Sequence, residues 1–253
     1  MDNSTHRDIY SRKVLLILDK INHPQGFTLD GFGGGKTMKG DNIHTEEIFK
    51  RAYGERDWNW YRNLVAEGIR YGTPGKWLDL GAGLGLFVEC ARRFGIDCIG
   101  LEGSEYAVEA AKERFPSIDM RQHFLEGRLP FKDNSISTIM CHQVIEHLSN
   151  KTMISMLKEC YRVLKQGGVM LIYSPSKYDR KQRLEKIHIN LLTPSLARKE
   201  LEKVGFRVIE TPNRSRMFLG ESQIAKLILR VVFRLFPLDY LSATANCIVF
   251  KPA

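Results

Sequence analysis

The stretch WLDLGAGLGLF, residues 77–87, carries the strongest structural signal in the chain. An apolar strand ends in Asp79, and Gly81, Gly83 and Gly85 then lead directly into a helix. Glycine lets a backbone approach a ligand closely, and a helix N-terminus presents free N–H groups. In an open α/β sheet the ligand lies beyond the carboxyl ends of the strands, where this loop falls. The stretch therefore predicts an α/β domain with a ligand-binding loop.

The segments that follow this stretch alternate between strand and helix patterns. Alternation of this kind predicts a doubly wound parallel sheet with helices on both faces. Strands are expected at residues 76–80, 98–101, 120–125, 136–141, 169–173, 206–210 and 246–250. Helices are expected at residues 84–95, 104–115, 150–168 and 194–204, with Ser104 and Thr193 as N-caps and Pro194 at a first helical position.

Residues 1–73, before the predicted sheet, show a different sequence pattern, without the alternation of strands and helices. Residues 1–73 are expected to form helices at about 10–21, 44–52 and 56–71, with a glycine-rich linker, DGFGGGKT, at residues 30–37. The linker resembles a nucleotide-binding P-loop, but Asp30 stands where the pattern requires its first glycine. We therefore interpret residues 1–73 as a helical lid with glycine hinges, and residues 74–253 as the main domain with a helical insertion at about 212–244.

Composition limits the classes of protein. The chain has 253 residues and a net charge of +9, and the positive surplus lies mainly in its C-terminal part. No apolar run approaches the length that spans a membrane, which predicts a cytoplasmic protein. The five cysteines show neither CxxC pairing nor the histidine spacing of a zinc site, so we expect reduced core thiols and no metal.

The glycine spacing narrows the ligand. A dinucleotide fingerprint, G-x-G-x-x-G, would require glycine at position 86, which holds Leu86. The next strand ends near Glu102, 21 residues after Gly81, and an acidic side chain there can accept both hydroxyls of a ribose. Glu102 therefore predicts a nucleoside ligand without selecting one cofactor.

Together the motifs resemble those of the class I S-adenosylmethionine-dependent methyltransferases. LDLGAGLG is similar to the first motif of that family, LPFKDNSISTIMCHQVIEHL to the segment around the fourth strand, and LKQGGVMLIYSPS to the fifth-strand motif. HINLLTPSLARKELEKVGF resembles the small-molecule branch that includes ubiquinone-type and sugar methyltransferases. The match covers about residues 75–250, and it implies a seven-stranded, mostly parallel Rossmann-like sheet with an antiparallel last strand.

The resemblance also implies S-adenosyl-L-methionine as the cofactor. The backbone of the glycine loop would meet its methionine part, with Asp79 nearby, and Glu102 would hold the ribose. The family often has Asp before LPF to contact the adenine, whereas this chain has Leu125 beside Glu126, so the Glu126 side chain and the backbone near Arg128 and Leu129 stay open as alternatives. The expected cofactor-binding residues are Asp79, Gly81, Ala82, Gly83, Gly85, Glu102, Gly103, Glu126, Arg128, Leu129, His142 and Gln143.

Histidines after the fourth and fifth strands are the candidate catalytic residues. Methyl transfer to a hydroxyl benefits from a general base, whereas an amine or carboxylate acceptor needs mainly alignment. The candidates after the fourth strand, in CHQVIEHL, are His142, Gln143, Glu146 and His147, and His188 lies after the fifth strand. Each of His147 and His188 has a structural reading beside the catalytic one, as a packed or orienting side chain.

The acceptor is inferred from charge. SKYDRKQR, residues 176–183, is basic. Residues 223–236 show an apolar helix with a basic stripe, a pattern typical of a helix at a membrane surface and also of one that covers the sheet edge or the acceptor pocket with a basic outer face. We expect a small-molecule, glycan or lipid-linked acceptor that is anionic and whose nucleophile is an oxygen atom. An RNA methyltransferase and a non-catalytic cofactor-binding scaffold are the alternatives; the SPS sequence after the fifth strand differs from the motif of many base-amine methyltransferases, so nucleic acid is the weaker partner.

Overall fold

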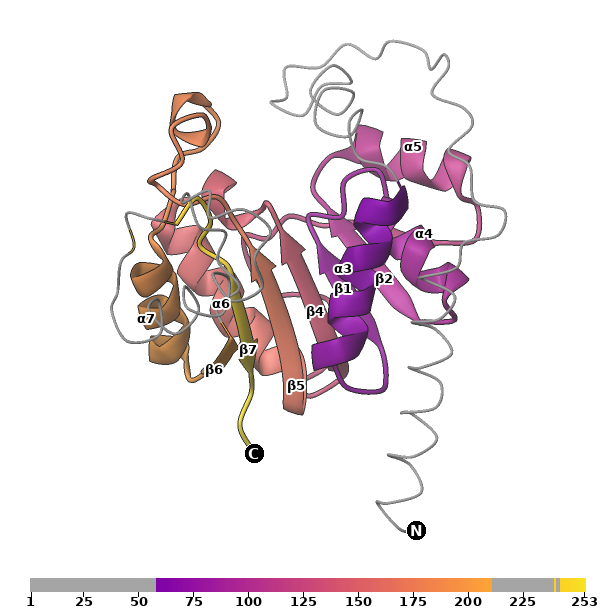
Figure 1. Ribbon diagram of the computed structural model, residues 1–253. Coiled ribbons are helices and arrows are strands. Elements are labelled where there is room, and N and C mark those ends of the chain that lie inside the picture. The colour runs from indigo at the N-terminus through magenta and orange to yellow at the C-terminus, as the bar shows by residue number, and fades with distance from the viewer. Residues whose placement is uncertain (1–57, 211–238, 240–241) are drawn as a thin grey trace, which may run out of the picture. The chain divides into compact units, whose positions relative to one another are not determined.

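The computed structural model describes residues 58–210, 239 and 242–253 (Figure 1). Its strands form one seven-stranded sheet in the order β3-β2-β1-β4-β5-β7-β6. β7 runs antiparallel to both β5 and β6, while β1, β2 and β3 pair in parallel. The strands are β1 Trp77–Leu80, β2 Cys98–Glu102, β3 Asp119–Gln122, β4 Ile136–His142, β5 Leu164–Tyr173, β6 Arg207–Glu210 and β7 Cys247–Phe250. This arrangement confirms the predicted α/β sheet with its antiparallel last strand.

The described helices accompany these strands in the predicted alternation. They are α3 Trp58–Tyr71, α4 Leu86–Arg93, α5 Glu105–Arg114, α6 Asn150–Val163 and α7 Pro194–Val204, with short 3-10 turns η1 Ile145–His147 and η2 Gln182–Leu184. The chain divides into two compact units, and the described parts of these are residues 58–124 with 135–140, and residues 125–134 with 141–210, 239 and 242–253.

The first unit surrounds β1, β2 and β3. Leu78, Leu80, Ile99 and Leu101 are completely or almost completely buried, so β1 and β2 read as continuous apolar strands, as expected of a parallel sheet. The Oγ atom of Ser104 accepts a hydrogen bond from the N–H of the third residue of α5, which confirms the predicted N-cap.

The second unit is built on α6, β5, α7, β6 and β7. Met153, Met156, Leu157 and Cys160 form the buried face of α6, which is the face that the sequence pattern predicts. The helix α7 begins after Thr193, whose side chain caps it, and ends at Gly205, whose φ of 112° is left-handed. Residues from Lys177 to Asn190 leave the carboxyl end of β5, and the η2 turn extends past that end in Figure 1.

The helix expected at residues 150–168 is too long by five residues. The structure ends α6 at Val163, and Leu164 already has extended backbone angles, with φ −65° and ψ 138°. The N–H of Gly167 donates to the carbonyl of Lys251 at 2.8 Å, and the N–H of Lys251 donates to the carbonyl of Gly168 at 2.9 Å. Pairing with the C-terminal segment therefore overrides the helical pattern and adds residues 164–168 to β5.

Several sequence predictions lie outside the described residues. The helices expected at 10–21 and 44–52, the linker at 30–37 and almost all of the insertion at 212–244 belong to this group, so the lid and the basic helix stay predictions. All five cysteines are buried free thiols, which confirms the expectation from their spacing. In the part of the chain that the structure describes, no helix combines the length and apolar character needed to cross a membrane.

Candidate cofactor and acceptor site

The loop between β1 and α4 has the left-handed backbone that its glycines predict. The φ angles are 66° at Gly81, 52° at Gly83 and 70° at Gly85. A Cβ atom added to Gly85 would lie 2.7 Å from the Cδ1 atom of Ile118, so both the backbone angle and the packing require glycine there. The loop therefore presents bare backbone at the start of α4.

Glu102 is tied directly to this loop. Its carboxylate accepts hydrogen bonds from the backbone N–H of Gly83 and of Ser104, each at 2.9 Å. The side chain belongs to a residue that is only 8% exposed, and the backbone carbonyl of Glu102 accepts from the N–H of His123. Two main-chain donors thus hold the carboxylate, which still has acceptor capacity for a ligand.

Asp79 lies at the carboxyl end of β1 in the same unit. Burial raises the pKa of its carboxyl well above the ordinary value, because the charged form loses its hydration, and the negative charge of Glu102 raises it further. Two acidic groups in one buried region favour a ligand with positive charge. The region therefore fits a ligand with positive charge, and the contact of Glu102 with a ribose stays a prediction.

Two further residues of the predicted set complete this loop region. Ala82 is buried, and its N–H donates to the carbonyl of Leu101 at 3.0 Å, which fastens the loop to the end of β2. The carbonyl of Gly103 accepts from the Gln122 side chain at 3.3 Å. A Cβ atom at Gly103 would lie 3.2 Å from the exposed ring of Phe124, so the backbone here is closely covered.

The residues proposed for the adenine belong to the second unit. Glu126 and Arg128 are exposed, and Arg128 forms an ion pair with Asp133 at 3.8 Å. Leu129 is buried, and its backbone N–H donates to the carboxylate of Glu159 at 2.8 Å. The amide of Leu129 is thus engaged within the fold, while the roles of all three residues toward a cofactor stay predictions.

His142 and Gln143 end β4. The ring of His142 is half-buried, with its centroid 5.9 Å from that of Tyr173. Gln143 has a φ of 54°, in the left-handed region, and its N–H donates to the carbonyl of Tyr173 at 2.7 Å. A left-handed backbone at a residue other than glycine costs free energy of about 1 kcal/mol or more, and such positions cluster at functional sites.

The structure brings His147 and His188 together. Their ring centroids lie 4.9 Å apart, although the residues are 41 positions apart in the sequence. Glu146, which the sequence groups with the candidate bases after the fourth strand, is fully buried beside them, and its carboxylate accepts from the Ser174 hydroxyl at 3.1 Å. Ligand atoms of Glu146, His147 and His188 all lie within 4.8 Å of one another. We name this the EHH cluster.

The segment that carries His188 is amphipathic and exposed. Leu184 is 83% exposed and Ile189 is 65% exposed. The exposed basic side chains of the same segment are Lys177, Arg180, Lys181, Arg183 and Lys186. Residues 177–190, which we name the strap, therefore combine positive charge with bare apolar surface next to the EHH cluster.

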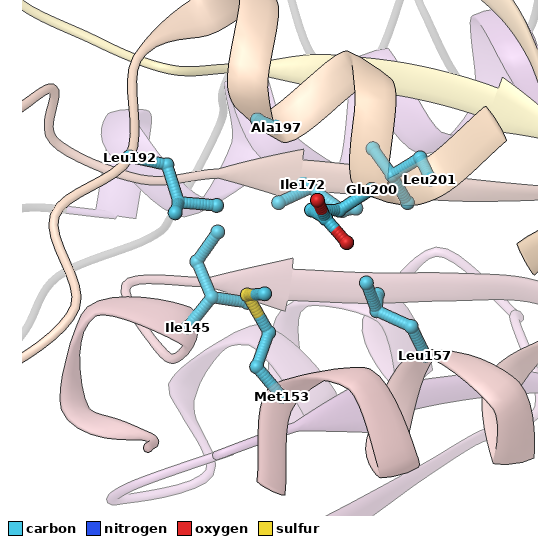
Figure 2. Close-up of a pocket in the computed structure, with 8 residues that line it drawn as sticks. All are labelled: Ile145, Met153, Leu157, Ile172, Leu192, Ala197, Glu200 and Leu201. Carbon is cyan, nitrogen blue, oxygen red and sulfur yellow. The ribbon is translucent and has the colours of Figure 1, made fainter. Parts of the chain in front are cut away.

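A small cavity in the second unit is too small for a cofactor. Figure 2 shows side chains of η1 and α6 facing those of α7 across it, with Ile172 of β5 between them. The volume is about 10 Å³, near the minimum for one water molecule. The lining residues are Ile145, Met153, Leu157, Ile172, Leu192, Ala197, Glu200 and Leu201. We therefore assign it to core packing.

Comparisons with known proteins agree with this geometry. Residues 78–172 match the family described as "Methyltransferase domain". A probable S-adenosylmethionine-dependent methyltransferase of Mycolicibacterium smegmatis is 34% identical over 135 residues, which are 52% of this chain and 50% of that protein. The mitochondrial ubiquinone biosynthesis O-methyltransferase of Rattus norvegicus is 30% identical over 109 residues, 40% of this chain and 31% of that protein.

A solved structure shows the same fold. A SAM dependent methyltransferase from Archaeoglobus fulgidus superposes with a TM-score of 0.57 at 17% identity, covering 81% of this chain and 99% of the other. The match over residues 78–172 and the named relative support a class I S-adenosylmethionine-dependent methyltransferase domain, and the solved structure shows that the fold is shared. The chain spans about half the length of the first curated relative, so the activity of the whole protein is a matter for proposal.

Proposed function

We propose that this chain transfers a methyl group from S-adenosyl-L-methionine to an oxygen atom of an anionic small-molecule, glycan or lipid-linked acceptor. The observation that carries the proposal is the glycine loop with Glu102 hydrogen-bonded to its backbone, in a domain of the methyltransferase family. Relatives are named as O-, N- and C-methyltransferases, so the choice of oxygen rests on the histidines that follow β4 and β5.

We assign separate contacts with the cofactor to Glu102, to Asp79 and to the glycines of the loop. The cofactor supplies an electrophilic methyl group on a positively charged sulfur. Glu102 accepts the ribose hydroxyls with the acceptor capacity that the N–H groups of Gly83 and Ser104 leave over. The carboxylate form of Asp79 is stabilised by the positive charge of the cofactor, which offsets its burial. Bare backbone at Gly81 and Gly83 permits close approach.

The EHH cluster and His142 are the groups we assign to acceptor activation. They lie at or after the carboxyl ends of β4 and β5, the strand ends at which α/β proteins bind ligands. A hydroxyl must lose its proton as the new C–O bond forms, and removal by a placed group contributes about 10²–10⁴-fold in rate. Replacing His147 or His188 by Ala should therefore slow turnover far more than it weakens cofactor binding.

The strap supports an acceptor that carries negative charge or a lipid tail. Its five exposed basic side chains attract anions, and Leu184 and Ile189 offer apolar contact. Peripheral contact with a membrane through residues 223–236 is part of the same proposal and lies outside the described residues. We also propose a cytoplasmic location, because no apolar run of the sequence approaches the length that spans a membrane.

Charge reversal tests the acceptor. The double variant Lys181→Glu, Arg183→Glu should raise the KM for an anionic acceptor about tenfold or more at low salt, and the difference from wild type should shrink as salt screens the charges. The matched control is Lys158→Glu, Lys165→Glu, which changes the same charge at exposed lysines outside the strap. Equal KM values in the two double variants, independent of salt, would contradict an anionic acceptor guided by the strap.

A further inference from the structure

The EHH cluster combines one carboxylate with two imidazoles in a small volume. Glu146 and His147 come from η1, and His188 comes from the strap. One oxygen and two ring nitrogens lie within 4.8 Å of one another, and Glu146 is fully buried while both histidines are half-buried. Two histidines and one carboxylate form a ligand set for zinc and for other divalent transition metals.

Hydrogen bonds define the tautomer of both rings. The Nδ1 atom of His147 lies 3.1 Å from the carbonyl oxygen of Ile187, and the Nδ1 atom of His188 lies 3.0 Å from the carbonyl oxygen of Gln182. A carbonyl oxygen only accepts, so each Nδ1 carries the hydrogen and donates it. A neutral ring then keeps its lone pair on Nε2. This is the arrangement in which metal-binding histidines are commonly held, with the other ring nitrogen donating to a backbone carbonyl.

The backbone holds the two contributing segments together. The carbonyl oxygen of Glu146 accepts from the N–H of Ile189 at 2.9 Å and from the N–H of Asn190 at 3.0 Å. These bonds join the strap to η1 at the residues next to the ligands themselves. The cluster is therefore organised before any ion binds, which reduces the conformational entropy lost on binding.

The burial of the Glu146 carboxylate also favours a bound cation on electrostatic grounds. A carboxylate removed from water is destabilised unless hydrogen bonds or an opposite charge compensate. The Ser174 hydroxyl supplies one hydrogen bond to Oε2. A divalent cation between this carboxylate and the two Nε2 atoms would add an opposite charge at the same place.

We propose that Glu146, His147 and His188 bind one divalent transition-metal ion, with zinc as the best match to the ligands. The ion is held by one carboxylate oxygen and two Nε2 atoms. Two ligand atoms on a tetrahedral zinc lie about 3.4 Å apart, given bonds of about 2.0–2.1 Å. The three ligand atoms, which lie within 4.8 Å of one another, therefore need to approach one another by up to about 1.4 Å to coordinate the ion. Three ligands leave at least one coordination position open, as in catalytic zinc sites. The sequence predicted no metal because its ligands are not arranged in a local zinc motif.

The open coordination position allows the acceptor hydroxyl to bind to the ion, an inference that rests on the proposed function. An acceptor hydroxyl that coordinates the ion loses its proton to solvent more readily, because the ion stabilises the oxygen anion. The oxygen then forms a bond to the methyl carbon, the carbon–sulfur bond breaks, and its electron pair goes to sulfur, which becomes neutral. With the ion bound, His147 and His188 act as ligands, and coordination replaces proton transfer to a ring.

Direct metal binding tests the site without a methylation assay. The full chain is freed of metal by a chelator and titrated with Co²⁺, followed by visible absorption, and with Zn²⁺, followed by calorimetry. Wild type should bind one equivalent of each ion. His188→Ala should bind each ion at least about 100-fold more weakly than wild type. His147→Ala and Glu146→Gln should show the same loss. His123→Ala is the matched control, since it removes a histidine of the first unit, and it should bind like wild type.

The outcomes separate this inference from the proposed function. Thermal unfolding of the metal-free proteins identifies a variant that fails to fold, and His188→Ala, which changes a half-buried residue of the strap, keeps the test available if Glu146→Gln does not fold. Equal Co²⁺ stoichiometry and affinity in wild type and His188→Ala would overturn the metal site. Normal metal binding by a chain that transfers no methyl group would leave the metal site standing and overturn the proposed function.

Discussion

Replacing Glu102 by Ala tests the proposed contact between this carboxylate and the ribose of the cofactor. The carboxylate accepts two backbone N–H bonds of 2.9 Å, from Gly83 and Ser104, in a residue that is 8% exposed. A hydrogen bond to a charged group contributes about 1.5–3 kcal/mol. Loss of two ribose bonds to the carboxylate should therefore weaken cofactor binding by about 3 kcal/mol, or roughly 100-fold in Kd.

The same substitution has a smaller effect on folding. The two N–H groups lose their acceptor, which costs about 1–3 kcal/mol in the free energy of unfolding, because water can reach a ligand-binding loop and replace part of the lost bonding. Glu102→Gln keeps the size of the side chain, but its amide group can accept from one N–H while its own hydrogens oppose the other. Both variants should be weak binders that still fold.

Calorimetric titration with S-adenosyl-L-methionine measures the first effect, and urea unfolding measures the second. Glu109→Gln is the matched control, because Glu109 is an exposed glutamate of α5 in the same unit. A Kd for Glu102→Ala within threefold of the wild-type value, in a protein that urea unfolding shows to be folded in the absence of urea, would refute the assignment of Glu102 to the ribose.

Three further substitutions, at Gly85, Asp79 and Arg162, test other contacts of the fold and the site. Gly85→Ala should lower the free energy of unfolding by about 1–3 kcal/mol in urea titrations, because the new Cβ would lie 2.7 Å from Ile118 at a φ of 70°; an unchanged urea midpoint would contradict this. The raised pKa of Asp79 favours the neutral acid, so Asp79 costs stability as pH rises above its ordinary pKa of 3.8. A cationic cofactor that favours the carboxylate should release a proton on binding at a pH between 3.8 and the raised pKa. Calorimetry in two buffers of different ionisation enthalpy should detect that proton in wild type and not in Asp79→Asn. Arg162→Met should cost about 2–3 kcal/mol at neutral pH, and this cost should shrink as pH falls below about 4.5, because a hydrogen bond from Arg162 lowers the pKa of Glu159 and its stabilisation is lost on protonation; a pH-independent difference would argue against that pair.

The glycine loop could be predicted because its determinants are local. The spacing of Gly81, Gly83 and Gly85 after an apolar strand predicts both the left-handed turns and the start of α4. In the structure all three glycines have left-handed φ angles, and α4 begins after Gly85. Glu102 was also predictable, since it ends the next strand. Its bond to the N–H of Gly83 adds a contact that spacing alone does not show.

The EHH cluster could be predicted only in part. His147 and His188 were candidates on their own. Their approach depends on hydrogen bonds from the N–H groups of Ile189 and Asn190 in the strap to the carbonyl of Glu146, which lies 43 and 44 positions earlier in the sequence. Nothing in the local pattern of either segment specifies that contact. The end of α6 was missed for a similar reason, because the residues at 164–168 pair with Lys251, almost at the end of the sequence.

Transfer of a radiolabelled methyl group tests the central claim most directly. The purified chain is incubated with labelled S-adenosyl-L-methionine and with fractions of cell extract that contain small molecules, lipids or RNA. We predict label in a small-molecule, glycan or lipid fraction, and none above background with Glu102→Ala. Absence of label from every fraction, by a chain that binds the cofactor, would contradict the account and favour a binding protein without catalysis.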